Sequence, residues 1–326
     1  MNQPLLRIRD LRVAFGTHAV IRGVNFDVAA GEAVGLVGES GSGKSTLARA
    51  ILRLLRPAEG GVQLLGLDLL QMPAAELRRR RRDLQIVFQD PLSSLNPRMT
   101  VGEAIGEPLK IFETGMNTAA RQLKVAAMLQ RVGLSADLAA RYPHEFSGGQ
   151  CQRIAIARAM ILSPKLLVCD EVVSSLDVSI QGQIVNLLLD LQREARMSLL
   201  FISHNLAVVR HLCDRVLVIY LGKLVEIAPS DALFASPVHP YTRALLAAVP
   251  QVMREADAPV AAAGLEALEP PTTARLTDLG CAFRDRCPYA LPVCETTDPP
   301  LAEVSPGHWA ACHRSHETLI PLSFAP

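Results

Sequence analysis

The sequence offers no run of about 18 consecutive apolar residues, the length that a membrane-spanning helix requires. It also carries little net charge (+1 at pH 7), so no global field favours nucleic acid as a partner. The first ten residues, MNQPLLRIRD, lack the basic-then-apolar pattern of a signal peptide. We therefore expect a cytosolic chain, and its 326 residues allow one large domain with an appendage or two domains.

Cysteine is scarce over most of the chain, but four of the seven cysteines lie near the C-terminus: Cys281, Cys287, Cys294 and Cys312. Disulfides are rare in the cytosol, whereas four thiolates on a loop-rich segment are enough to ligate a metal centre. The first two gaps between these cysteines are longer than those usual in zinc knuckles, which makes zinc a weaker candidate for the bound metal. Plain buried thiols and a disulfide pair remain alternatives. Before this segment, an Ala-, Pro- and Glu-rich stretch from Pro250 to Gly280 indicates a linker.

Residues 38–46 read GESGSGKST and follow Ala33–Val37, a short apolar run of strand type. They contain the pattern G-x-x-x-x-G-K-[ST], in which glycines let backbone N–H groups converge on phosphate oxygens. Lys44 can reach the outer phosphates, and the Ser45 hydroxyl can ligate Mg²⁺. The sequence therefore predicts a nucleoside triphosphate site whose loop contacts are Gly38, Ser40, Gly41, Gly43, Lys44, Ser45 and Thr46.

Two predicted strands end in polar side chains that suit hydrolysis. Lys165–Asp170 delivers Asp170 and Glu171 to its carboxyl end, where ligands bind in open α/β sheets. Asp170 suits the Mg²⁺ shell, and Glu171 suits polarising the attacking water. Leu84–Phe88 ends at Gln89, whose amide can ligate Mg²⁺ or position a water.

Three further features are ambiguous when they are taken alone. His204 follows the predicted strand Leu199–Ile202 and can contact a γ-phosphate, but a surface histidine is equally consistent. Phe15 could stack on a purine or could be a core phenylalanine. Phe146–Gln150 (FSGGQ) could form a second anion cradle at a helix start, or only an ordinary N-cap.

Alternation predicts antiparallel strands over Leu5–Phe15 and Val24–Val28. Val101–Arg141 is expected to be helical with breaks at Gly106, Pro108, Gly115 and Gly133. The five arginines of Arg78–Arg82 are interpreted as a solvated helix face, since no second basic run or interleaved aromatics accompany them.

The order of these motifs resembles that of an ABC-transporter ATPase subunit over roughly Leu5 to Pro250. Gly38–Ser45 matches its Walker A segment, Gln89 its Q-loop and Ser147–Gln150 its signature. Asp170–Glu171 matches Walker B, Ser175–Asp177 the D-loop and His204 the H-loop. Phe15 falls where that family places its adenine-stacking aromatic. The phrases GESGSGKST, VFQDPLSSLNPR, LDVSIQ and HPYTRALL look like the peptide-importer branch.

This resemblance implies an α/β fold: a RecA-like core, an antiparallel β subdomain and an α-helical subdomain. The expected domains are an ATPase domain over 1–250, a linker over 251–280 and a cysteine-rich extension over 281–326. The expected ligands are ATP and Mg²⁺, the Mg²⁺ held by Ser45, Gln89 and Asp170. Glu171, His204 and Gln89 are the expected catalytic residues. Signature residues Ser147, Gly148, Gly149 and Gln150, together with Asp177, are expected to contact nucleotide in a composite site.

The resemblance also implies partners: a second, related ATPase subunit, two transmembrane permease subunits and, indirectly, an extracytoplasmic substrate-binding protein. The chain would then act peripherally at the cytoplasmic face of the inner membrane, without nucleic acid. The alternative is a soluble ABC ATPase acting on nucleic acid or ribosomes, although such proteins usually fuse two cassettes or insert long coiled coils. Some members of the peptide branch carry a 4Fe–4S cluster at the C-terminal cysteines, which favours that cluster here over zinc.

Two positions depart from the family pattern. Cys151 stands where the signature helix usually has a basic residue, and Val172 stands where Walker B usually continues with proline. Neither change removes a phosphate ligand or a carboxylate, so we expect an active site.

Overall fold

The computed structural model describes residues 3–248 and 279–317. Every residue is buried in the three central strands of the parallel part of its larger sheet. These strands are β3 (Ala33–Val37), β8 (Ser198–Ile202) and β7 (Leu166–Asp170), parallel and adjacent in that order. Continuous apolar runs are typical of parallel strands that are covered on both faces. β6 (Leu84–Val87) extends the parallel set on one side and β9 (Arg215–Tyr220) on the other.

Alternate side chains of these strands enter two separate apolar cores. From β3, Val34 and Leu36 pack in the core that contains α1 (Lys44–Ile51), whereas Ala33 and Val37 pack in the other. Fully burying such a side chain stabilises the fold by about 1.5–3 kcal/mol. The second core also receives the apolar faces of α6 (Gly148–Met160), α7 (Val178–Ala195) and α8 (Leu206–Leu212).

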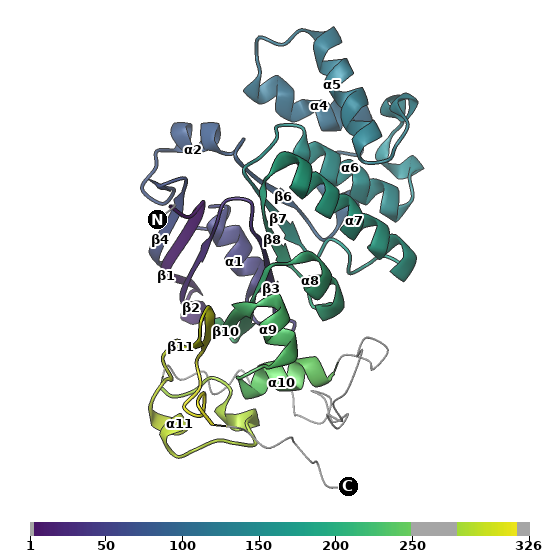
Figure 1. Cartoon of the computed structure of the whole chain (residues 1–326). Coiled ribbons are helices and arrows are strands. Elements are labelled where there is room, and N and C mark those ends of the chain that lie inside the picture. Colours follow the sequence, from purple (N-terminus) through teal and green to yellow (C-terminus); the bar gives the residue numbers. More distant parts are fainter. Residues whose placement is uncertain (1–2, 249–278, 318–326) are drawn as a thin grey trace.

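A smaller antiparallel sheet covers the α1 side of the core, in the strand order β2-β1-β4-β5. It comprises β1 (Leu6–Phe15), β2 (His18–Val28), β4 (Glu59–Leu64) and β5 (Leu67–Asp68). Alternating buried and accessible residues in β1 give the sheet one face toward the core and one toward solvent (Figure 1). The predicted antiparallel pairing of the N-terminal strands is confirmed.

A helical lobe stands at the opposite end of the molecule from the C-terminal extension (Figure 1). Its main helices are α4 (Val101–Phe112) and α5 (Thr118–Arg131), which pack beside α6. The Thr100 side chain and Glu103 form a capping box that fixes the start of α4. The shorter helices of this half are α2 (Ala74–Arg80), α3 (Pro91–Ser94), η1 (Ala136–Ala140) and η2 (Pro143–Glu145).

The C-terminal region continues the larger sheet. After β9 the chain turns into β10 (Lys223–Pro229), which pairs antiparallel with both β9 and β12 (His308–Ala310). β11 (Ala302–Ser305) closes that edge, so the described part of the extension is joined to the core through backbone pairing. Its helices are α9 (Ser230–Ala235), α10 (Pro240–Ala247), η6 (Arg284–Arg286) and α11 (Val293–Thr296).

The expected helix breaks at Gly106 and Pro108 are wrong, because α4 runs through both residues. The buried side chains of Ala104, Ile105 and Leu109 hold this helix against its neighbours, and that packing outweighs one missing backbone donor. The predicted linker lies outside the described residues except for its last two positions. Among the described residues, no helix combines the length and apolarity needed to span a membrane.

Candidate active site

Two glycines shape the loop between β3 and α1, because a side chain at either position would displace neighbouring atoms. A Cβ on Gly38 would lie 2.3 Å from the carbonyl oxygen of Ile219. Gly43 has a φ of 104° in the left-handed region and forms the N-cap of α1 without a side-chain cap. The first N–H groups of α1 therefore face the loop, as a phosphate cradle requires.

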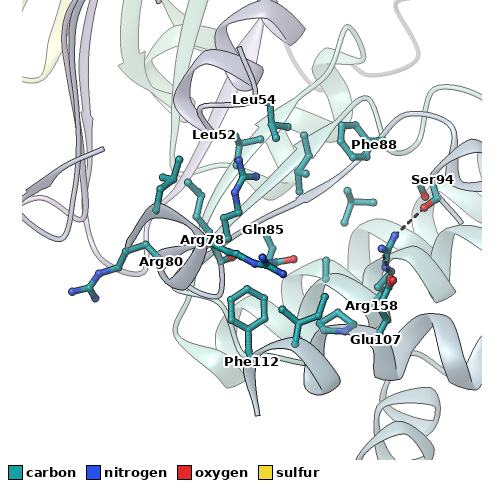
Figure 2. A pocket seen from close by; sticks show the side chains of 18 of the residues that line it. Leu52, Leu54, Arg78, Arg80, Gln85, Phe88, Ser94, Glu107, Phe112 and Arg158 are labelled. Carbon is teal, nitrogen blue, oxygen red and sulfur yellow. Dashed lines mark hydrogen bonds and ion pairs between the residues drawn. The ribbon is translucent and has the colours of Figure 1, made fainter. Parts of the chain in front are cut away.

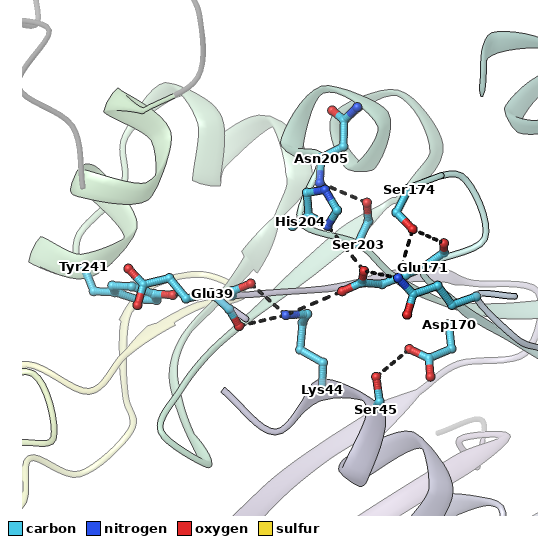
Figure 3. Close-up of polar contacts among 12 residues, drawn as sticks. Glu39, Lys44, Ser45, Asp170, Glu171, Ser174, Ser203, His204, Asn205 and Tyr241 are labelled. Atoms are coloured by element: carbon cyan, nitrogen blue, oxygen red, sulfur yellow. Dashed lines mark hydrogen bonds and ion pairs between the residues drawn. The ribbon is translucent and has the colours of Figure 1, made fainter. Parts of the chain in front are cut away.

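Lys44 is buried at the base of this loop, with 5% of its side chain exposed. Its Nζ donates to the carbonyl oxygens of Gly38 (2.9 Å) and Glu39 (2.8 Å) and lies 3.9 Å from Oε1 of Glu171. Burial lowers the pKa of Lys44, while the neighbouring carboxylates of Glu171, Asp170 and Glu39 oppose that shift. The loop thus encloses one ammonium group that faces the carboxylate of Glu171 (Figure 3).

Two of the predicted Mg²⁺ ligands meet directly, because Ser45 Oγ donates to Asp170 Oδ1 at 2.8 Å. Burial raises the pKa of Asp170, and the hydrogen bond from Ser45 partly offsets that rise. A hydroxyl and a carboxylate are hard oxygen donors of the kind that Mg²⁺ takes. The pair joins the start of α1 to the end of β7, so the donor set fits the expected ion.

Glu171 collects the remaining predicted catalytic residues around its carboxylate. Its Oε2 lies 3.4 Å from Nε2 of Gln89 and 3.5 Å from Nδ1 of His204. Sequence reasoning missed Ser174, whose Oγ accepts from Gln89 Nε2 (3.3 Å) and donates to the Glu171 carbonyl oxygen (2.9 Å). Figure 3 shows Glu171, Ser174 and His204 near one another, from the end of β7, the loop after it and the end of β8.

The backbone of Glu171 is strained, with a φ of 51°. A non-glycine residue in the left-handed region costs of order 1–3 kcal/mol, and such strain clusters at functional sites. The Glu171 N–H donates to the carbonyl oxygen of Ile202 at 3.0 Å, which holds the turn against the neighbouring strand. This turn aims the carboxylate back over the loop, within reach of Lys44.

The signature segment forms a complete helix cap of its own. Ser147 Oγ accepts from the Gln150 N–H (3.4 Å), and Gln150 Oε1 accepts from the Ser147 N–H (3.0 Å). A Cβ on Gly149 would lie 2.7 Å from Cγ2 of Ile180, so glycine permits the close approach of α7. In the described part of the chain, no hydrogen bond or ion pair joins residues 147–150 to the loop at 38–46. The nucleotide contact of Ser147, Gly148, Gly149 and Gln150 stays a prediction.

Other predicted residues fall at accessible positions around the loop. Phe15 is 53% exposed at the end of β1, so its interpretation as a core phenylalanine is wrong. Ser40 and Gly41 are exposed at the loop tip, and Thr46 lies half-buried in the first turn of α1. Asp177 is the N-cap residue of α7, without a side-chain cap hydrogen bond.

The two departures from the family pattern lie in the core. Cys151 is fully buried, and its thiol contacts the carbonyl oxygen of Pro143 at 3.4 Å. Val172 is 1% exposed and packs in the core that receives α6, α7 and α8. Both therefore act as apolar packing residues. For Cys151 this is the usual behaviour of a small buried thiol.

The four C-terminal cysteines line one small cavity of about 20 Å³ together with His313. Burial raises the pKa of Cys281 to about 11 and that of Cys287 to about 12. Within residues 3–248 and 279–317, no three His, Cys, Asp or Glu side chains are placed to hold a metal ion. The described residues therefore do not form the single-ion site that zinc would need.

A larger groove of about 340 Å³ separates the helical lobe from the sheet. Figure 2 shows Arg78 of α2, Phe88 after β6, Phe112 of α4 and Arg158 of α6 around it. Arg158 is fixed there by hydrogen bonds to the Ser94 carbonyl oxygen and to Glu107 Oε2, both 2.8 Å. Of the five arginines in Arg78–Arg82, the groove is lined by Arg78, Arg80 and Arg81.

Two family descriptions match the chain: ABC transporter over residues 21–174, and oligopeptide/dipeptide transporter, C-terminal region, over residues 225–294. The chain is 49% identical over 326 residues to the oligopeptide transport ATP-binding protein OppF of Salmonella typhimurium, covering 94% of this chain and 95% of that protein. It is 48% identical over 301 residues to OppF of Haemophilus influenzae, covering 91% and 89%. Among solved structures, cbiO1 from Clostridium perfringens, part of the ABC transporter complex cbiONQ, has a TM-score of 0.66 at 25% identity, covering 72% of this chain and 92% of that one.

The position of Glu171 predicts that Glu171→Gln keeps nucleoside triphosphate affinity but lowers turnover by roughly a hundredfold or more. The charge that orients the attacking water is lost, while Lys44, Ser45 and Asp170 remain. Equilibrium binding and steady-state phosphate release measure the two effects separately. Lys44→Ala should instead weaken nucleoside triphosphate binding itself. Glu194→Gln, at a 60% exposed carboxylate on α7, is the control and should change neither affinity nor turnover. Turnover near the unmodified rate in Glu171→Gln would refute the role of this carboxylate.

Proposed function

Because this chain belongs to the ATP-binding subunits of ABC transporters, within the oligopeptide/dipeptide branch, we propose that it hydrolyses ATP to energise a peptide importer. The observation that carries the proposal is the contact of Ser45 with Asp170 beside Glu171, because it brings Mg²⁺ ligands and a base to one phosphate loop. The relatives are named for oligopeptide transport, so an ATPase acting on nucleic acid or ribosomes is not favoured.

In this function each residue has a separate task. Lys44 and the α1 N-terminus bind the phosphates, and Ser45, Asp170 and Gln89 supply oxygen ligands for Mg²⁺. A bound Mg²⁺ neutralises charge that develops on the phosphates during transfer. Glu171 orients the attacking water, and His204, which lies beside it, contacts the γ-phosphate. Phe15, exposed at the end of β1, is free to stack on the adenine ring.

The assembly that we propose contains a second, related ATPase subunit, two permease subunits and, indirectly, an extracytoplasmic binding protein. Ser147–Gln150 would then meet nucleotide held by the loop of the partner, with Asp177 at the same interface. Support comes from the lack of a hydrogen bond or ion pair between residues 147–150 and the phosphate loop within the described part of this chain. The subunit would work at the cytoplasmic face of the inner membrane as a peripheral protein.

The groove beside the helical lobe is the proposed docking place of a permease segment. It is lined by apolar side chains such as Leu54, Phe88 and Ile111, with the cation of Arg78 at its wall, whereas Arg158 is already paired with Glu107. An amphipathic helix with an acidic residue beside its apolar face suits such a surface, because its apolar side fills the groove and its carboxylate meets Arg78. Docking there couples the lobe to the loop that carries Gln89.

Membrane fractionation tests this function in cells that produce the chain with or without its permease. We expect the chain to sediment with membranes only when the permease is present. Ile111→Glu, in the groove, should abolish that association, whereas Leu123→Glu, at a 72% exposed site on α5 outside the groove, should not. Sedimentation with nucleic acid at low salt, independent of the permease, would favour the rival ATPase instead.

We also propose a 4Fe–4S cluster at Cys281, Cys287, Cys294 and Cys312, with the structural role of stapling the cysteine-rich extension over 281–326. Three observations support it: the four thiols share one cavity, Cys294 is buried, and the Cys281 N–H donates to the Cys294 carbonyl oxygen at 2.8 Å. Thiolates that ligate a cluster bind different iron atoms, so they need not converge on one point as for a single ion.

Anaerobic purification tests the cluster through metal content and colour. The protein should show broad visible absorbance and about four iron atoms per chain. Cys294→Ser should lose both, whereas Cys151→Ser, at a buried thiol in α6, should keep them. Colourless protein with stoichiometric zinc, or with no metal, would exclude the cluster.

A further inference from the structure

The C-terminal region holds one residue of the phosphate loop, Glu39, from two directions. Arg286 of η6 donates from Nη1 to Glu39 Oε2 and from Nη2 to Oε1, both at 2.9 Å. The hydroxyl of Tyr241, on α10, accepts from the Glu39 N–H at 2.8 Å. Figure 3 shows Tyr241 and Lys44 on opposite sides of Glu39. The side chain and the backbone of this loop residue are therefore both fixed by residues outside the ATPase motifs.

Both partners of Glu39 are themselves rigidly held. The Arg286 side chain is 8% exposed, and its guanidinium lies 5.8 Å from the ring centroids of both Tyr220 and Phe283. Tyr241 is fully buried at the start of α10, where its N–H donates to Nδ1 of His239 at 3.0 Å. A planar guanidinium paired with a carboxylate through two hydrogen bonds fixes orientation as well as distance.

Glu39 also contacts the phosphate-binding lysine. Its carbonyl oxygen accepts from Lys44 Nζ at 2.8 Å, so one residue links Arg286 to the ammonium that binds phosphate. The Glu39 carboxylate lies in the loop that receives a polyanion, and unpaired it would repel the phosphates. The pairing with Arg286 removes that repulsion while it holds the loop in place.

We propose that Arg286 is a positioning residue for ATP binding, which acts through Glu39 and carries the order of the cysteine-rich extension to the phosphate loop. This inference rests on the proposed function, because it concerns the affinity of the same loop for ATP. It assigns a task to η6, whose last residue precedes Cys287 in the chain. Tyr241, in the segment His239–Tyr241, holds the same loop through its hydrogen bond from the Glu39 N–H.

The test measures the MgATP dissociation constant, the KM and the kcat of the full chain with its partners and with Arg286 or Glu39 changed. Arg286→Gln should weaken MgATP binding by roughly tenfold, through a higher KM with kcat at saturation within about twofold. The MgATP affinity of Arg286→Lys should lie between those of the unmodified chain and Arg286→Gln, because lysine keeps the charge but loses the paired hydrogen bonds. Arg131→Gln breaks an exposed arginine–carboxylate pair with Glu194 outside the loop and the extension, and as the matched control it should bind as the unmodified chain does.

A double-mutant cycle separates this role from general stability. If Arg286 acts through Glu39, the variant carrying both Glu39→Gln and Arg286→Gln binds MgATP no more weakly than Arg286→Gln alone. Glu39→Gln and Arg286→Lys keep the test informative if Arg286→Gln does not fold. Affinity of Arg286→Gln within twofold of the unmodified chain, or penalties that multiply in the double variant, would overturn the inference alone. Failure of the unmodified chain to bind MgATP would instead overturn the proposed function.

Discussion

The hydrogen bond from Ser45 to Asp170 is the contact on which the rest of the site depends, because it joins segments 125 residues apart. It forms only if β3 and β7 run parallel in one sheet with β8 between them, so that both deliver their carboxyl ends to the same edge. The two apolar cores secure that arrangement from either face. Glu171, the next residue along the chain, then reaches the loop through a strained turn.

Much of this arrangement could be predicted from the sequence, because local patterns encode it. The loop glycines, the buried strands and the polar residues that end them all carry short-range signals. Pro108 shows where such signals fail, since packing of the apolar face of α4 keeps the helix intact. Ser174 and the pairing of Glu39 with Arg286 were missed for another reason. No local pattern specifies partners 85 and 247 residues apart, and only the folded chain brings them together.

The C-terminal region is joined to the core sheet and supports the phosphate loop. In the described residues its hairpin β11–β12 is part of the core sheet, and the buried pair of Glu226 with His308, 2.7 Å apart, ties β10 to β12. The aromatic rings of Tyr220, Tyr241 and Phe283 pack against one another, and the Tyr241 hydroxyl accepts from the N–H of Glu39 in the loop. The extension therefore contributes to the wall of the site.

We propose that this chain presents a complete phosphate cradle but only half of each hydrolytic site. Residues 147–150 cap α6 and make no hydrogen bond or ion pair to the loop of the same chain within the described structure. The most direct measurement is the rate of ATP hydrolysis per molecule, followed as the concentration of the chain rises and as a partner ATPase is added. If each site is shared between two subunits, this rate increases in both titrations. A rate per molecule that stays constant at every concentration and ignores the partner would contradict it.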